Sequence, residues 1–252
     1  METGAELIGV DRPVRPALAL GHDAGRRHPG EGLQAQDLPQ AHLPTVRPVP
    51  RQATIPSDEA IHDARTGDVW LFRGHSIADR AIRVATNAPV NHVAMAVALD
   101  DLPPLMWHTE LGRSLEDVWT GDHHRGAQLN RLADAYTVWT SKYGQQAFVR
   151  QFDGEITRAM EDDLLRVIAA YDGKPFPTPR RLASRWIAGR FRKEATGEAV
   201  YCAQLMAITF RRMGLLDPKR PSNWYDPGKF WSGDRLELAN GASLGDELAV
   251  LD

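Results

Sequence analysis

The stretch Gly197-Glu-Ala-Val-Tyr-Cys-Ala-Gln-Leu-Met-Ala-Ile-Thr-Phe-Arg-Arg-Met-Gly214 carries the only cysteine of the chain, Cys202. After Cys202, apolar residues recur at helical spacing, which predicts a helix with the thiol in its first turn. The free N–H groups and the dipole at a helix N-terminus favour an anion, so they lower the pKa of a thiol placed there. This position suits a nucleophile. Cys202 also shares a face with the apolar residues, so a buried structural thiol is the alternative.

The composition is that of an ordinary globular protein. Of the 252 residues, 42% are hydrophobic and 25% are charged, and the formal net charge is -3. A single cysteine cannot form an internal disulfide, which favours a reducing compartment. We find no pattern typical of a secretory signal or a membrane span and therefore expect a cytoplasmic protein. The slight negative charge argues against a nucleic-acid partner.

The sequence divides into three segments. Residues 1–56 are rich in proline, glycine, arginine and histidine and have no sustained apolar period, which predicts a disordered leader. Residues 57–235 contain the periodic segments and form the predicted folded domain. Residues 236–252 are assigned to a C-terminal tail.

Two neighbouring segments hold candidate partners for the thiol. The run Asn91-His-Val-Ala-Met-Ala-Val-Ala-Leu99 predicts a core strand that begins at His92. Leu105-Met-Trp-His-Thr-Glu110 predicts a second strand paired with it, in which alternation places His108 and Glu110 on one face. A nucleophilic thiol needs a base and a polar group that orients the base. His92 is the candidate base, and its alternative role is that of a solvated strand-end histidine.

The remaining periodic segments predict a mixed α+β domain. They are a strand at residues 69–72, a helix capped by Ser76 and ended by Pro89, a strand at 146–152, a helix at 156–171 and a turn-rich aromatic loop at 221–231.

Several segments, taken in their order along the chain, resemble the permuted papain-like cysteine hydrolases of the YiiX type, which are relatives of lecithin:retinol acyltransferase and of the NlpC-type peptidases. The resemblance implies an α+β, circularly permuted papain-like fold, with an antiparallel sheet packed against helices and the catalytic cysteine at a helix N-terminus. The matching segments are Thr66-Gly-Asp-Val-Trp-Leu-Phe72, Ile82-Arg-Val-Ala-Thr86, Asn91-His-Val-Ala-Met95, Met106-Trp-His-Thr109, Tyr171-Asp-Gly-Lys-Pro-Phe176, Val200-Tyr-Cys-Ala-Gln-Leu205 and Asp226-Pro-Gly-Lys-Phe230.

The resemblance also implies a role for each candidate residue. Cys202 is then the nucleophile, His92 the base and His108 the residue that orients the base. Glu110 is the alternative to His108, because a carboxylate would hold an imidazolium more strongly. The sequence departs from the family at Ala203-Gln204, where Ser-Glu is common, and at Lys174-Pro-Phe, which replaces a usual Pro-Tyr pairing.

The expected function is that of a thiol hydrolase (amidase or peptidase) or acyltransferase. It would act on an amide or ester bond of a small molecule, peptide or lipid through an acyl-Cys202 intermediate. The alternative is a non-catalytic peptide- or lipid-binding module of the same fold, in which the cysteine is structural. A reaction of this kind needs no cofactor, and we expect none.

Two other charged segments bear on partners. Asp122-His123-His124 lacks a completing ligand nearby, so we expect no metal site. The stretch from Arg180 to Lys193 is basic and amphipathic, as in segments that lie on an anionic lipid surface. Its alternative is an ordinary solvated helix face.

Overall fold

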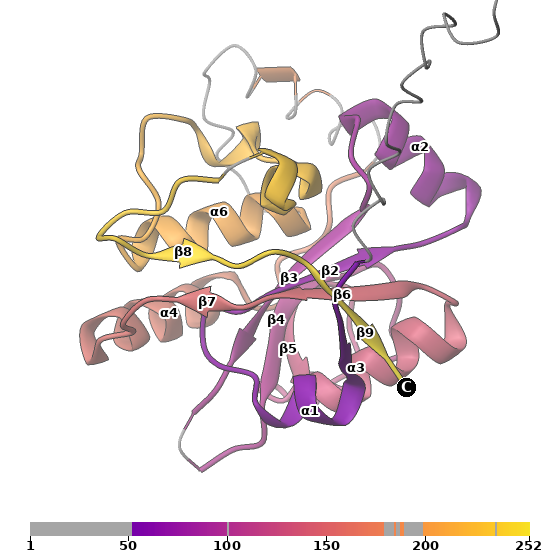
Figure 1. Cartoon of the computed structure of the whole chain (residues 1–252), viewed down its shortest axis with the longest axis horizontal. Helices are drawn as coiled ribbons and strands as arrows, with labels where there is room; N and C mark the ends of the chain where they lie inside the picture. The colour runs from indigo at the N-terminus through magenta and orange to yellow at the C-terminus, as the bar shows by residue number, and fades with distance from the viewer. Residues whose placement is uncertain (1–51, 100, 179–183, 185–186, 189–198, 235) are drawn as a thin grey trace, which may run out of the picture. The chain divides into compact units, whose positions relative to one another are not determined.

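A seven-stranded sheet organises the part of the chain that the computed structural model describes, which is residues 52–252 without 100, 179–183, 185–186, 189–198 and 235 (Figure 1). The strand order is β1-β9-β6-β2-β3-β4-β5. Strands β1 and β9 are parallel, and the other neighbours are antiparallel. The strands are β1 (Thr54–Pro56), β2 (Val69–Arg73), β3 (His92–Val97), β4 (Leu105–Glu110), β5 (Gly126–Arg131), β6 (Gln146–Arg150) and β9 (Leu248–Leu251).

The central strands are buried on both faces. Every residue of β3 and β4 is buried, as are the first four residues of β2. Because helices cover both faces of the sheet, the sequences of such strands are nearly continuous apolar runs and do not alternate between apolar and polar residues. The predicted pairing of the strands that hold His92 and His108 is confirmed, with Met95 opposite Trp107.

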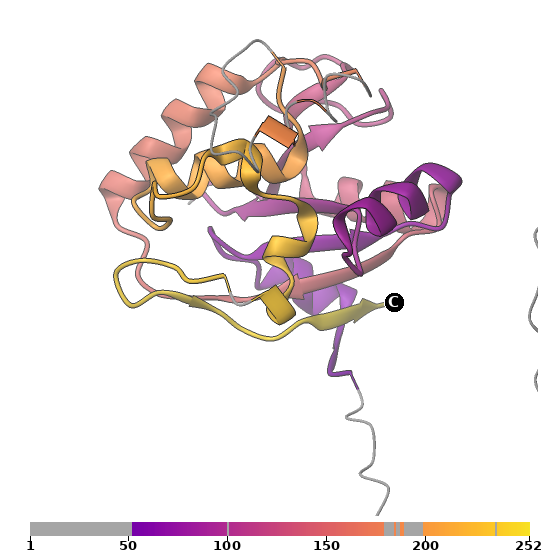
Figure 2. The ribbon, with the colours of Figure 1, turned by 90° about the horizontal axis from the view of Figure 1, so that it is seen from above.

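Different helices cover the two faces of the sheet. Helices α6 (Cys202–Arg212) and α4 (Arg158–Tyr171) pack on the face that carries Val93, Met95 and Trp107 (Figure 2). The opposite face carries Trp70 and Met106. It is covered by α1 (Ser57–His62), α3 (Leu132–Thr137) and the π-helix η1 (Val138–Lys142).

Helix α6 begins at Cys202, as its apolar spacing predicts. Leu205, Met206 and Phe210 are fully buried, and each such side chain contributes about 2 kcal/mol through loss of contact with water. Trp107 of β4 donates a 3.2 Å hydrogen bond from Nε1 to Oγ1 of Thr209. This bond ties the helix to the neighbour of the strand that holds His92.

Helix α2 (Ile77–Thr86) begins at the predicted cap. Ser76 and Asp79 form a capping box, in which each side chain accepts a hydrogen bond from the other residue's backbone N–H. Asn91 links this helix to β3, because its Nδ2 donates to Asp79 Oδ1 at 2.9 Å and its Oδ1 accepts from the Gly74 N–H at 2.6 Å. The start of β3 is therefore fixed by side-chain hydrogen bonds.

Two segments assigned outside the folded domain take part in the sheet. Residues Thr54–Pro56 fall in the predicted leader but form β1, and Ile55 is buried there. Residues 236–252 were assigned to a tail, but they contain β9 and also β8 (Ser243–Leu244), which pairs with β7 (Phe152–Asp153). In β9, Val250 is buried, Leu248 and Ala249 are partly buried, and Leu251 is exposed.

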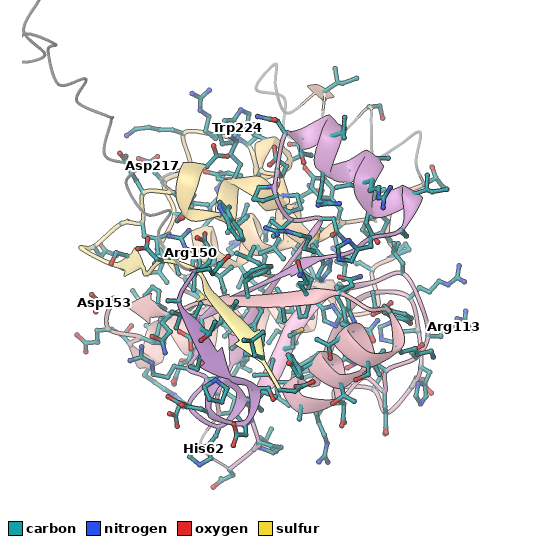
Figure 3. The ribbon with its side chains drawn as sticks, turned by 45° about the vertical axis from the view of Figure 1, so that its right-hand side comes forward. His62, Arg113, Arg150, Asp153, Asp217 and Trp224 are labelled. Atoms are coloured by element: carbon teal, nitrogen blue, oxygen red, sulfur yellow. The ribbon has the colours of Figure 1, made fainter. Side chains whose placement is uncertain are left out.

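Arg150 joins the C-terminal segment to the centre of the domain. This buried side chain donates hydrogen bonds to the carbonyl groups of Phe230, Leu244 and Gly245 at 2.6–2.9 Å. In Figure 3 it lies among the strands, whereas Arg113 points outward. Among the described helices, none combines the length and apolar character needed to cross a bilayer.

Candidate active site

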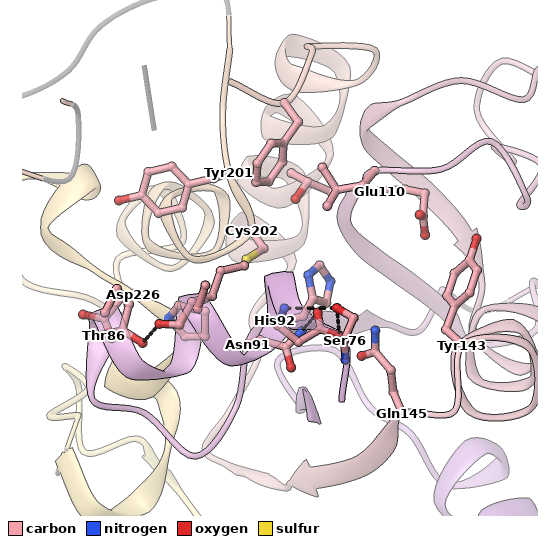
Figure 4. Close-up of a pocket in the computed structure, with 18 of the residues that line it drawn as sticks. Ser76, Thr86, Asn91, His92, Glu110, Tyr143, Gln145, Tyr201, Cys202 and Asp226 are labelled. Atoms are coloured by element: carbon pink, nitrogen blue, oxygen red, sulfur yellow. Dashed lines mark hydrogen bonds between the residues drawn. The ribbon is translucent and has the colours of Figure 1, made fainter. Parts of the chain in front are cut away.

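A cavity of about 800 Å³ opens where β3 and α6 begin. His92, the first residue of β3, and Cys202, the first residue of α6, both line it (Figure 4). Glu110, at the end of β4, also lines the cavity. The structure thus brings the predicted nucleophile, the predicted base and one candidate orienting residue to one pocket. Apolar side chains form much of the remaining wall, among them Ile82 and Ala85 of α2 and Phe176.

Cys202 is only 6% exposed. Burial raises the pKa of its thiol from 9.0 to about 11, although the backbone N–H groups of Val93, Ala203 and Cys202 itself favour the thiolate. The nearby Asp226 carboxylate raises this pKa further. The expectation of a lowered thiol pKa is therefore wrong for this conformation. The helix N-terminus does favour the anion, but the loss of water outweighs it.

His92 lies on the face of the sheet opposite α6. Its ring centroid is 4.1 Å from that of Trp139 and 6.0 Å from that of Phe72. Burial, and secondarily the neighbouring His108, lower the pKa of His92 well below 6.5. Within the described part of the chain, the His92 ring and the Cys202 thiol form no hydrogen bond with each other. The thiol instead lies against the backbone N–H of Val93, the next residue after His92.

His108 lies beside His92. The two ring centroids are 5.5 Å apart and the ring planes are nearly perpendicular, at 88°. His108 Nε2 is 2.6 Å from Asn130 Oδ1, and both side chains are fully buried. Burial lowers the pKa of His108, although Glu110, the bond to Asn130 and Asp117 each favour the imidazolium. The spacing prediction that His108 and Glu110 share a face agrees with these contacts.

Glu110 is engaged by groups other than the histidines. One carboxylate oxygen accepts from the Gly112 N–H at 2.6 Å, and the other accepts from Trp139 Nε1 at 3.0 Å. Trp139 also contacts His92, with ring centroids 4.1 Å apart and ring planes tilted by 49°, so the indole lies against both residues. This geometry favours His108 as the neighbour of the base.

Sequence reasoning missed three residues of this region. Trp139 and Asn130 lie between residues 111 and 145, where we predicted no element. Asp226 belongs to a segment that supports the family resemblance, but we assigned it no role. It lines the cavity, and its effect on the Cys202 pKa places it near the thiol.

The start of α6 is held in place from outside the helix. The Tyr201 hydroxyl oxygen lies 2.8 Å from the carbonyl oxygen of Asn223 and 3.0 Å from that of Tyr225, and its single proton is shared between these two acceptors. Residues 222–224 and 227–230 form the short 3₁₀-helices η2 (Ser222–Trp224) and η3 (Pro227–Phe230) of the predicted aromatic loop. These bonds fix the position from which Cys202 enters the pocket.

A separate group of potential metal ligands lies outside this pocket. The ligand atoms of Asp117, His124 and Asp172 are all within 4.8 Å of one another. His124 Nε2 is 2.6 Å from Asp117 Oδ2, and burial together with Asp117 raises the pKa of Asp172 to about 7. His124, for which the sequence alone indicated no completing ligand, therefore lies beside two carboxyl groups. The basic stretch from Arg180 to Lys193 lies outside the described residues except for Ser184, Ile187 and Ala188.

Comparisons with known proteins bear on the fold. No protein-family model matches the chain, and no curated protein sequence matches it. The chain is similar to the crystal structure of the metalloprotein yiiX from Escherichia coli O157:H7, a DUF1105 protein, with 17% sequence identity and a TM-score of 0.41. The match covers 60% of this chain and 66% of that chain. At this TM-score and identity the likeness carries no argument about the site, which is interpreted from its own residues.

Proposed function

We propose that the protein is a cysteine-dependent hydrolase or acyltransferase that cleaves an amide or ester bond through an acyl-Cys202 intermediate. The observation that carries this proposal is the meeting of the chain's single thiol, at the first residue of a helix, and a buried histidine in one cavity. His92 serves as the base, and His108 is the neighbour that orients it.

The charge state of the pair suggests how the thiol reacts. The raised pKa of Cys202 and the lowered pKa of His92 favour a neutral thiol beside a neutral imidazole rather than an ion pair. The S–H proton therefore passes to the imidazole while the sulfur forms its bond to the carbonyl carbon. The carbonyl π electrons move to oxygen, and backbone N–H groups at the α6 N-terminus stabilise that oxyanion.

Collapse of this intermediate breaks the bond to the leaving amine or alcohol, which takes the proton from His92. Water or an acceptor then attacks the acyl-Cys202 thioester and gives a proton to His92. The bond from carbon to sulfur breaks, and His92 returns that proton to the sulfur. Catalytic hydrogen bonds are often long in free enzymes and tighten when substrate binds. A small approach of the thiol and the imidazole on binding is thus a requirement of the proposal.

The pocket suits a substrate with an apolar part. A cavity of about 800 Å³ falls within the range of ligand sites, and its wall combines apolar side chains with a few polar groups. The carboxylates of Asp79, Glu110 and Asp226 also line it. These features are compatible with a small molecule, a peptide or a lipid as the source of the acyl group.

The test uses an activated ester together with intact-protein and peptide mass spectrometry. We expect an acyl adduct on Cys202 in the wild type, none in Cys202→Ser, and turnover lowered by about 10² or more in His92→Ala. The double variant should be no worse than the worse single variant, because both residues serve one step. Thermal unfolding of each variant controls for folding. Wild-type turnover by Cys202→Ser would leave the structural-thiol alternative as the better account.

A further inference from the structure

A directed chain of buried hydrogen bonds begins on β5 at Gln128. Its Nε2 lies 3.1 Å from the carbonyl oxygen of His124 and 3.5 Å from that of Gly126. Backbone carbonyl groups can only accept, so the nitrogen of the Gln128 amide must face them. The side-chain oxygen, Oε1, is thereby left as an acceptor for the next residue in the chain.

Asn130 is the next residue. Its Nδ2 donates to Gln128 Oε1 at 3.1 Å and to the Glu116 carbonyl oxygen at 2.7 Å. With both N–H bonds used in this way, Asn130 Oδ1 is the atom that faces His108 Nε2 at 2.6 Å. Because an amide oxygen can only accept, His108 must carry a proton on Nε2. The neutral ring then has its lone pair on Nδ1.

The remaining atoms of the two histidines complement each other. His108 Nδ1 and His92 Nε2 are both buried and have no hydrogen-bond partner among the described residues. The rings lie 5.5 Å apart between centroids and nearly perpendicular. A proton on His92 Nε2 would satisfy both atoms through a small reorientation, with His92 as donor and His108 as acceptor. His92 would then keep its own lone pair on Nδ1, the nitrogen left to take the thiol proton.

The polar chain lies on a face of the sheet that is otherwise rich in apolar residues. Gln128 and Asn130 are fully buried, and they stand opposite His108 and Met106 in the strand register. Burying two amides requires that their hydrogen bonds be made, whereas two apolar side chains would fill the space without that requirement. The hydrogen bonds of the two amides connect backbone carbonyl groups to one nitrogen of His108. Apolar side chains of similar size would fill the space but would not make this connection.

We propose that Asn130 is a positioning residue of the thiol site, which fixes the tautomer of His108 and, through it, the tautomer of His92. This inference rests on the proposed function, in which neutral His92 accepts the thiol proton. Asn130 touches neither the substrate nor the thiol in this account. It acts because a His92 with its proton on Nδ1 would present a donor, not an acceptor, to Cys202.

The first experiment reads the tautomers without activity. The protein is labelled with ¹⁵N-histidine, and long-range ¹H–¹⁵N spectra are recorded near pH 8, with His92→Ala and His108→Ala used to assign the two rings. We expect Nε2 protonated and Nδ1 unprotonated in both rings of the wild type. A wild-type His108 protonated on Nδ1 and bare on Nε2 would overturn the inference, whatever any variant does.

The second experiment compares Asn130→Leu with a matched control. Thr209→Val also removes buried hydrogen bonds, the one accepted from Trp107 and the one donated to the Leu205 carbonyl, but on the face away from the histidines. With an activated ester, we expect Asn130→Leu to lower kcat by about 10² with KM changed less than about threefold, and Thr209→Val to leave kcat within about threefold. Asn130→Leu should also populate the other His108 tautomer. Asn130→Leu combined with His108→Ala should be no slower than His108→Ala alone.

The outcomes separate this inference from the proposed function. Wild-type kcat in folded Asn130→Leu, or equal losses in Asn130→Leu and Thr209→Val, would overturn the role of Asn130 while the thiol mechanism stands. If the wild type forms no acyl-Cys202 adduct with the ester, the proposed function fails, and the positioning role for catalysis fails with it. The tautomer spectra would still show whether Asn130 sets the ring protons. If Asn130→Leu does not fold, the wild-type spectra decide the question.

Discussion

The pH dependence of Cys202 alkylation is the most direct consequence of the buried thiol. Burial raises the thiol pKa from 9.0 to about 11, so that about one thiol in 10⁴ is ionised at pH 7, compared with about one in 10² without the shift. A thiolate of higher pKa is more nucleophilic, with a Brønsted slope of about 0.4–0.5, which returns somewhat less than a factor of ten. We therefore expect iodoacetamide to label Cys202 about tenfold more slowly than a free thiol, before any effect of restricted access.

The assay follows alkylation by mass spectrometry from pH 6 to pH 10.5, with a small thiol measured in parallel. The labelling rate should rise about tenfold for each pH unit throughout this range, because the thiolate fraction does so below the pKa. A rate that is already constant between pH 6 and pH 8 would mean that a thiolate is formed at neutral pH. That result would refute the argument that burial dominates at this helix N-terminus.

Asp226→Asn tests the electrostatic part of the same argument. The carboxylate raises the thiol pKa, so its neutral replacement should lower the pKa and speed labelling at pH 8 by about threefold for each pKa unit of change, after the loss in nucleophilicity. The pKa should stay above 9.0, because burial is the largest cause of the shift. Asp153→Asn is the matched control, since it makes the same charge change at an exposed residue of β7. Equal effects of the two variants would contradict the local role of Asp226.

Two further predictions concern the base and the edge of the sheet. In the proposed mechanism the neutral form of His92 is the base, and burial lowers its pKa well below 6.5, so the acid limb of kcat/KM should lie below pH 6.5. A limb at or above pH 6.5 would show that the buried His92 is not the titrating base. Deleting residues 1–51 should leave the Tm within about 1 °C of the full chain. Deleting residues 1–56 should lower the Tm by about 4–8 °C, because β1 and the buried Ile55 are lost. Equal Tm values for the two truncations would contradict this role of β1.

The sequence predicts the elements whose signals are local. The helix that begins at Cys202, the strand that begins at His92 and the cap at Ser76 each follow from spacing or from one side chain. The strand that holds Gln128 and Asn130 gives no such signal, because it buries polar side chains where an apolar pattern would mark a strand. The reason for burying these two amides is visible only in the folded sheet, which places them beside His108.

The thiol pKa could not be predicted from the helix alone. The helix N-terminus favours a negative charge, and the backbone N–H groups that face the Cys202 sulfur do lower its pKa. The larger effect is burial, which depends on residues far away in the sequence, such as those of the loop that contains Asp226. The ends of the domain were misassigned for a similar reason, since short strands such as β1 and β9 are stabilised by their partners.

The two halves of the proposed reaction come from opposite faces of one sheet. Cys202 is carried by α6 on one face, whereas His92, His108 and Asn130 belong to the other, and the pocket forms where the strand and the helix both begin. The position of α6 on the sheet therefore decides whether the Cys202 sulfur and the His92 imidazole can meet. That position depends on contacts such as the hydrogen bonds that hold Tyr201 to the loop residues Asn223 and Tyr225. Residues that contact neither the thiol nor the base can thus control the reaction through the placement of one helix.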